Sequence, residues 1–357
     1  MKEVMLPYYD KPPILAKNVY PHMLTIAMNS SNALKWIAES FVQLFVEYDI
    51  NDNDVDPIFY LYDKGHYAHS YEYMVSMNRC CPFLSIYRHP YNEIDELGMG
   101  GLVDYLKNKI LNGYYIMIQV DVAKIKAYGY DRNKFIQHSP LLIGFNESKN
   151  IFYFRDFCGL YYNTHVVTYK ELEEAFFSFL SPENGCTSVS INIDYGISCI
   201  KLKETEYQFD LAILKYHLKN YIKIDNTQQN NMRFIGNKDI FYGVDIFDIL
   251  IKYIENKLSK DSSNIGGMTK FNHLVDHKKA MLIRNNFLKE NSYITDSEYQ
   301  KLLVEFTEAQ SIATTLQNLY FKYNMQKNDK IAYRIISNIN KLKSMDMDTV
   351  KYLIDII

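Results

Sequence analysis

The periodicity of apolar residues changes near residue 205, and this change limits the folds available to the chain. Before it, short runs rich in β-branched and aromatic residues, such as YYIMIQVDV, predict β-strands. After it, several long stretches repeat apolar residues at the spacing of amphipathic helices. They are FDLAILKYHLKNYI, GVDIFDILIKYIENKL, FNHLVDHKKAMLIRNNFLKE, SEYQKLLVEFTEAQSIATTLQNLYFKY and DKIAYRIISNINKLKSMDMDTVKYLIDII. The chain is therefore predicted to be an α+β protein, with an antiparallel sheet in a domain over residues 1–204 and an all-α helical bundle over residues 205–357.

Local motifs place further elements within the first domain. GLVDYLKNKILNG predicts a short amphipathic helix that ends at Gly113. The runs SPLLIGF and IFYFRDF predict two strands, and NESKN between them suits a hairpin turn. TYKELEEAFFSFL predicts a helix that begins with a capping box of Thr168 and Glu171. Residues 21–46 predict one or two helices, and TSVSINIDYGISCIKL predicts a last strand.

The charge and hydropathy patterns exclude several classes of partner. The 357 residues include 39 basic and 42 acidic side chains, which gives a net charge of −3 without any block of like charge. A nucleic-acid partner is therefore not expected. MKEVMLPYYDKPP lacks the apolar centre of a signal peptide, and no apolar run approaches the roughly 18–20 residues of a membrane-spanning helix. We expect a cytoplasmic protein without a membrane partner.

The cysteines form no recognisable disulfide or zinc pattern. Their number is odd, and no two of them are spaced as C-x-x-C. They are Cys80, Cys81, Cys158, Cys186 and Cys199. We therefore expect free thiols.

Two groups of histidines have spacings that metal sites also use. Asp63, His66 and His69 lie together in DKGHYAHS, but no helical histidine pair with a glutamate base accompanies them, which favours a polar loop cluster. His273 and His277 lie four positions apart on a predicted helix beside two lysines, which favours a solvent-exposed helix face. NIGG lacks the length and the lysine of a phosphate-binding loop, and no G-x-S-x-G motif occurs. No metal and no cofactor are therefore expected.

His138 and Asp156 form the strongest chemical signal in the sequence. His138 starts one predicted strand and Asp156 ends the next, so a hairpin that turns at NESKN would bring them side by side. A carboxylate in that place can accept the imidazole N–H and orient the ring as a general base. Such a base can activate a thiol at the N-terminus of a helix, where amide dipoles stabilise the thiolate. An ordinary hydrogen-bonded pair within a sheet is the alternative interpretation.

The segment HSPLLIGF, followed by FYFRD, is similar to the His-strand-turn-strand-Asp signature of C39-type papain-fold cysteine peptidases. More closely, the chain resembles the BtrH-like proteins of nonribosomal-peptide and other natural-product clusters. Further similar segments follow the family's order along the chain. They are NVYPHML, WIAESFVQLF, LNGYYIMIQVDV, VTYKELEEAF and FNHLVDHKKAMLIR. The resemblance implies a papain-like fold for the first domain and a role in acyl transfer.

The resemblance also indicates where a nucleophile would lie. NVYPHML looks like the family's Asn/Asp-Cys-x-Pro helix start, so Val19 occupies the position of the family's cysteine. A valine side chain cannot attack a carbonyl. Asn18 and Tyr20 flank this position and are expected to contact the substrate, although Asn18 also suits a simple helix N-cap. The backbone N–H of Val19 would be the natural donor to an oxyanion.

Two functions of different class follow. In the first, the protein transfers an acyl group from a thioester- or amide-linked intermediate, with His138 as base and Asp156 as orienter. An activated thioester allows direct attack by an amine, so no covalent enzyme intermediate is required. In the second, a non-catalytic relative that has lost its nucleophile binds a carrier protein, a peptide intermediate or a partner enzyme. Either role leaves a homodimer open.

Overall fold

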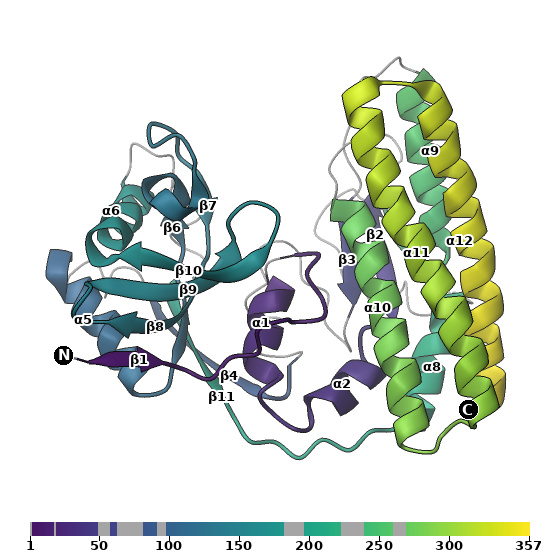
Figure 1. The fold of residues 1–357 in the computed structure, drawn as a ribbon, viewed down its shortest axis with the longest axis horizontal. Coiled ribbons are helices and arrows are strands. Elements are labelled where there is room, and N and C mark those ends of the chain that lie inside the picture. Colours follow the sequence, from purple (N-terminus) through teal and green to yellow (C-terminus); the bar gives the residue numbers. More distant parts are fainter. Residues whose placement is uncertain are drawn as a thin grey trace. The chain divides into compact units, whose positions relative to one another are not determined.

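The structure is a computed structural model that describes residues 2–17, 19–48, 58–62, 81–90, 98–181, 196–222, 239–259 and 269–357 (Figure 1). The chain divides into two compact units. One, called here the sheet unit, comprises Met1–Pro12, Asn18–Ser31 and Tyr73–Thr205. The other, called the helical unit, comprises Pro13–Lys17, Asn32–Glu72 and Glu206–Ile357. The predicted α+β class, with an antiparallel sheet in the N-terminal half and helices after it, is confirmed.

An antiparallel sheet of seven strands lies at the centre of the sheet unit. The strand order is β10-β9-β8-β5-β11-β4, and β1 pairs with β8. These strands are β1 (Glu3–Met5), β4 (Leu84–Pro90), β5 (Tyr115–Met117), β8 (Leu141–Asn146), β9 (Ile151–Phe157), β10 (Tyr162–Thr168) and β11 (Gly196–Leu202). A separate two-stranded ladder joins β6 (Val120–Asp121) to β7 (Gln137–His138). The sheet therefore contains both of the strands that the sequence predicted around NESKN.

The predicted hairpin and the predicted helix end are confirmed. Strands β8 and β9 pair as an antiparallel hairpin, and Asn150 in the turn has a left-handed φ of 52°, which asparagine tolerates better than most residues. Helix α5 (Gly98–Leu111) is followed by Gly113, whose φ of 82° suits a residue without a Cβ. In both turns, the residue with a positive φ is of a type that favours this conformation, so the local sequence is enough to predict the turn.

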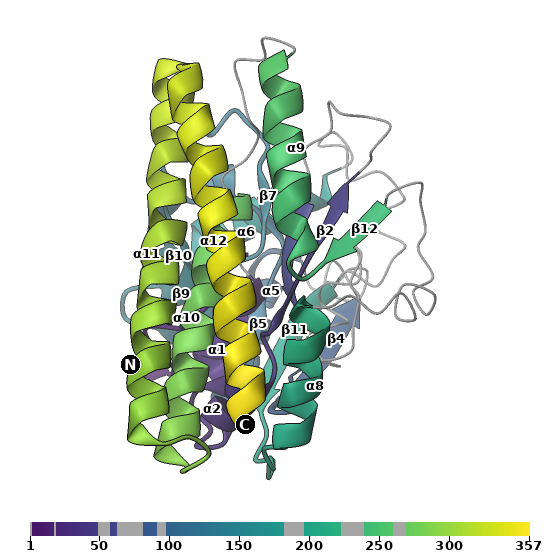
Figure 2. The ribbon, with the colours of Figure 1, turned by 90° about the vertical axis from the view of Figure 1, so that its right-hand side faces the viewer.

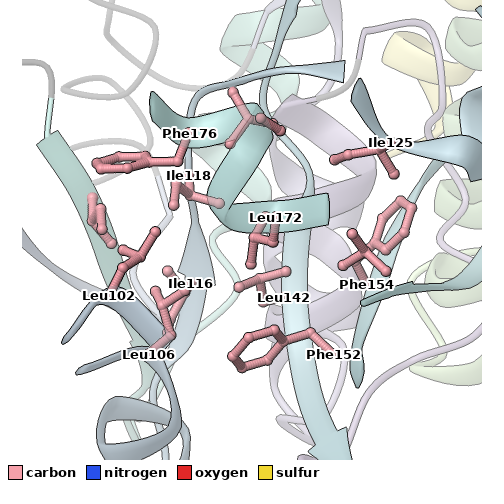
Figure 3. Close-up of a cluster of buried hydrophobic side chains, with 14 of the residues drawn as sticks. Leu102, Leu106, Ile116, Ile118, Ile125, Leu142, Phe152, Phe154, Leu172 and Phe176 are labelled. Atoms are coloured by element: carbon pink, nitrogen blue, oxygen red, sulfur yellow. The ribbon is translucent and has the colours of Figure 1, made fainter. Parts of the chain in front are cut away.

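Helices α5 and α6 (Tyr169–Leu180) bury the main apolar cluster of the sheet unit (Figure 3). The predicted capping box starts α6, because Thr168 accepts the N–H of Glu171 and the Glu171 carboxylate accepts the N–H of Thr168. Side chains from both helices meet those of the sheet strands. The cluster includes Leu102, Leu106, Ile116, Ile118, Ile125, Leu142, Phe152, Phe154, Leu172 and Phe176.

Helix α1 (Val19–Ala27) belongs to the other face of the sheet. It packs near β4 and β11, and its His22 and Thr25 contact the hydroxyl of Tyr162 on β10. Side chains alternate between faces along a strand, so Arg155 points away from the apolar cluster that contains Phe154. The sheet thus has an apolar face under α5 and α6 and a more polar face under α1.

Six helices of the described residues belong to the helical unit (Figure 2). They are α2 (Ala33–Glu39), α8 (Leu211–Ile222), α9 (Asp245–Ser259), α10 (Thr269–Glu290), α11 (Asp296–Gln326) and α12 (Asp329–Ile356). Helices α10, α11 and α12 pack consecutively, and α8 and α9 both contact α12. In the part of the chain that the structure describes, no helix combines the length and the apolar character needed to cross a membrane.

Residues 43–46, which the sequence predicted as helix, belong instead to strand β2 (Gln43–Tyr48). This strand lies between β3 (Ile58–Tyr62) and β12 (Asp239–Tyr242) in a three-stranded sheet. A short apolar run is compatible with a buried helix or a buried strand. Here the run forms a strand because it pairs with two other segments. The prediction of helix is therefore correct only for α1 and α2 in this region.

The same pairing affects the organisation of the chain. The predicted division at residues 204 and 205 falls next to the junction of Thr205 and Glu206, but residues 13–17 and 32–72 join the helical unit. Strand β12 also lies within residues 205–357, whose periodicity predicted helices alone. Contacts between segments that are distant in sequence produce both differences, because α2 packs on α10 and β2 pairs with β12.

The prediction that His273 and His277 lie on a solvent-exposed face is wrong. Both side chains are 0% exposed. Helix α10 packs against α2, α11 and β3, so little of its circumference is left to solvent. The imidazole Nε2 of His277 donates to the carbonyl of Val42 at 2.8 Å, and Lys278 beside it is also fully buried. The polar residues of α10 therefore form an internal network.

Candidate functional site

His138 and Asp156 lie in contact, as the sequence predicted. His138 ends β7, and Asp156 is the penultimate residue of β9. The imidazole Nε2 of His138 is 3.1 Å from Oδ2 of Asp156 and 3.2 Å from Oδ1. The histidine side chain is 32% exposed, whereas the carboxylate is fully buried. A buried carboxylate thus holds an imidazole that solvent can reach.

Two further donors hold the carboxylate of Asp156 in place. The hydroxyl of Tyr128 donates to Oδ2 at 2.5 Å, and the backbone N–H of Phe157 donates to Oδ1 at 2.7 Å. Burial favours the neutral form of this carboxyl, but the hydrogen bonds from His138 and Tyr128 favour the charged form and hold its pKa below the usual value. Asp156 is therefore a carboxylate near neutral pH.

Tyr128 is a fixed proton donor in this arrangement. Burial, and then the negative charge of Asp156, raise the pKa of the Tyr128 hydroxyl well above its usual value. Its ring also packs edge-on against the imidazole of His138, with centroids 6.0 Å apart. Tyr128 therefore orients both members of the pair.

These contacts determine which nitrogen of His138 can act as a base. The carboxylate of Asp156 accepts only, so Nε2 carries the proton of the neutral ring. The lone pair then lies on Nδ1, and this is the atom that would take a proton from a substrate. Such an arrangement has the geometry that a general base and its orienting carboxylate require.

Val19, the position that the resemblance assigns to a nucleophile, lies in the first turn of α1. Val19, the first residue of the helix, is partly buried, and Tyr20 is buried. Asn18 lies outside the described residues. One turn after Val19, His22 bonds through Nε2 to the carbonyl of Ser139 at 2.9 Å, and Ser139 follows His138 directly. The first turn of α1 is therefore tied to the residue beside the base, and the N–H of Val19 is among the helix-end donors without an intrahelical acceptor.

None of the described cysteines lies at the start of a helix, where the sequence predicts a nucleophile. Cys158 follows Asp156 by two positions, but burial and the charge of Asp156 raise the pKa of its thiol to about 12. A thiol with such a pKa stays protonated and unreactive near neutral pH. Cys81 and Cys199 are buried. All three are free thiols, as expected, while Cys80 and Cys186 lie outside the described residues.

Sequence reasoning found the pair but missed Tyr128 and His22. Tyr128 lies in KAYGY, where no local pattern marks it, and it reaches Asp156 only through the packing of a short turn before Gly129. His22 did carry a signal, because a histidine one turn after Val19 shares its helix face.

Among the described residues, no group of three or more histidine, cysteine, aspartate or glutamate side chains could hold a metal ion. Asp63, His66 and His69 lie outside the described residues. The candidate site therefore consists of an acid–base pair and a helix N-terminus.

No protein-family model and no curated protein matches the chain.

Proposed function

We propose that the sheet unit is a papain-like acyl-transfer domain that forms or cleaves an amide bond in peptide secondary metabolism. The observation that carries this proposal is the contact of His138 with the buried carboxylate of Asp156, fixed by Tyr128. The resemblance to BtrH-like proteins supports the same chemistry. The substrate would be a thioester- or amide-linked intermediate, and a carrier protein in the cytoplasm would deliver it.

The geometry suits direct attack on a thioester. An amine nitrogen would attack the carbonyl carbon of the acyl thioester while Nδ1 of His138 takes one of its protons. The N–H of Val19 would donate to the oxyanion of the tetrahedral intermediate. Collapse of this intermediate breaks the C–S bond, and the His138 imidazolium returns its proton to the departing thiolate. The products are an amide and a thiol, and because the thioester supplies the activation, no cofactor is needed.

The test is the rate at which the protein forms amide from a simple acyl thioester and a primary amine. Replacing His138 with alanine is expected to lower this rate by about 10²–10⁴-fold, because general-base catalysis is lost. His217→Ala on α8, in the helical unit, is the matched histidine control and should leave the rate unchanged. Equal rates for the unmodified protein and His138→Ala would remove the enzymatic proposal.

One observation favours a second candidate function. Val19 occupies the place of the family's cysteine, and the described cysteines offer no substitute. A non-catalytic relative would instead bind a carrier protein or peptide intermediate at the same surface. This candidate predicts saturable binding of an acyl carrier with no amide product, and binding that His138→Ala leaves intact.

A further inference from the structure

A second histidine, His22, lies beside the candidate site but is buried. Its side chain is 1% exposed, and its Nδ1 is 2.8 Å from the hydroxyl of Tyr162. The same hydroxyl is 3.3 Å from Oγ1 of Thr25, which lies one turn further along α1. The Nε2 atom of His22 bonds to the carbonyl of Ser139. One imidazole thus links the helix to strand β10 and to the connection between β7 and β8.

The hydrogen bonds of His22 have only one consistent arrangement. A carbonyl accepts only, so Nε2 donates to Ser139. Burial lowers the pKa of His22, which keeps the ring neutral, and Nδ1 therefore accepts from the Tyr162 hydroxyl. Tyr162 in turn accepts from Thr25. Each hydrogen bond that joins His22, Tyr162, Thr25 and Ser139 therefore has one assigned donor and one assigned acceptor.

The ring of Tyr162 is itself held by a buried cation. The Arg155 guanidinium lies 4.7 Å from the centroid of Tyr162 and 5.2 Å from that of Tyr8. Its NH1 group bonds to Asp10 at 2.7 Å and to Thr164 at 3.1 Å. An arginine paired with a carboxylate and packed against two aromatic rings leaves Tyr162 little freedom to move.

We infer that His22 and Tyr162 are positioning residues that set the first turn of α1 against His138. The inference rests on the proposed function and deepens it. His22 follows position 19 by one turn, and its acceptor Ser139 adjoins His138. Apolar side chains would fill the same space without the cost of burying polar atoms, but they would not select one carbonyl and one hydroxyl. The two hydrogen bonds of His22 therefore fix how α1 is rotated about its axis and how far along that axis it lies relative to the sheet. Acyl transfer is sensitive to such positioning.

The test uses a readout that needs no turnover. In a Val19→Cys background, iodoacetamide alkylates the thiol introduced at position 19, and peptide mass spectrometry measures the rate at that residue across a pH series. A thiol at a helix N-terminus beside His138 should have a lowered pKa and react at acidic pH. Adding Tyr162→Phe, which keeps the ring on Arg155, should lower the rate at pH 6 by about tenfold and move the pH profile upward. Adding His22→Gln instead should do the same.

Tyr115→Phe is the matched control, because the buried Tyr115 of the same unit loses only a hydroxyl that donates to the carbonyl of Pro7. It should leave the profile unchanged. A fast parent thiol that neither Tyr162→Phe nor His22→Gln alters in the folded protein would overturn the positioning role alone. A parent thiol that reacts no faster than a free thiol, with or without His138, would overturn the proposed function and this inference with it.

Discussion

Replacing Asp346 with alanine is expected to destabilise the helical unit by about 3–5 kcal/mol. Asp346 on α12 is 1% exposed and accepts hydrogen bonds from Lys278 and from the hydroxyl of Tyr221. Lys278 and Tyr221 are 0% exposed. Without the carboxylate, Lys278 would either keep a buried charge with no opposite charge to compensate it or give up its proton.

The surroundings of Lys278 explain why no simple rearrangement would rescue the variant. Its Nζ also lies 2.9 Å from Nδ1 of His277, whose other nitrogen donates to Val42. Burial lowers the pKa of Lys278, and the charge of Asp346 opposes this shift. Loss of Asp346 would therefore favour the neutral amine, and the protein would lose both the ion pair and part of the hydrogen-bond network.

Urea unfolding followed by circular dichroism measures the effect. The matched control is Glu308→Ala, because Glu308 pairs with Lys341 between α11 and α12 while both side chains are about half exposed, at 51% and 55%. That variant should change the free energy of unfolding by less than about 1 kcal/mol. The double variant Lys278→Met with Asp346→Leu should recover most of the loss. Similar values for Asp346→Ala and Glu308→Ala would show that the buried network contributes nothing.

The second large effect is expected from Asp156→Asn, which should lower the rate of amide formation by about 10³–10⁴-fold. The backbone N–H of Phe157 can only donate, so the amide oxygen of asparagine would take its place opposite that group. The amide nitrogen would then replace Oδ2, which lies 3.1 Å from Nε2 of His138 and accepts from Tyr128. The oxygen kept at Oδ1, 3.2 Å from Nε2, would be neutral and shared with Phe157. Nε2 would therefore lose its preference for the proton, and the tautomer with the proton on Nδ1, which has no lone pair there for the substrate, would become favoured.

Tyr128→Phe distinguishes the effect of the His138 tautomer on the rate from the effect of losing one hydrogen bond to Asp156. It removes one donor to Asp156 but leaves the carboxylate, so His138 keeps its proton on Nε2. The rate should fall by about tenfold, the equivalent of one hydrogen bond to a charged group. If Asp156→Asn, in folded protein, were no slower than Tyr128→Phe, then the carboxylate would not set the tautomer of the base.

Features decided within a few residues could be predicted from the sequence. The hairpin from β8 to β9, the capping box of α6 and the end of α5 each depend on turn or cap residues, and each is confirmed. The contact of His138 with Asp156 was predicted from the hairpin, and it forms although His138 ends β7, three residues before β8 begins. Such predictions need only local chemistry and the alternation of strands.

Features decided by distant contacts could not be predicted. Strand β2 exists because β3 and β12 pair with it, and its own residues suit a helix as well. The two lysines beside His277 predicted a surface residue. Its imidazole is instead buried, with hydrogen bonds to the carbonyl of Val42, which is 235 positions away, and to Lys278. Tyr128 joins the candidate site for the same kind of reason. Only tertiary packing reveals which polar residues have buried partners.

The proposed function requires His138 to act as a base on a group held at the first turn of α1. Intact-protein mass spectrometry of a Val19→Cys variant, incubated with a simple acyl thioester, tests it most directly. One acyl group should be added to the variant and none to the unmodified protein, and peptide mapping should place it at residue 19. Combining the variant with His138→Ala should prevent the addition. A folded Val19→Cys variant that gains no acyl group, or gains it equally without His138, would contradict the account.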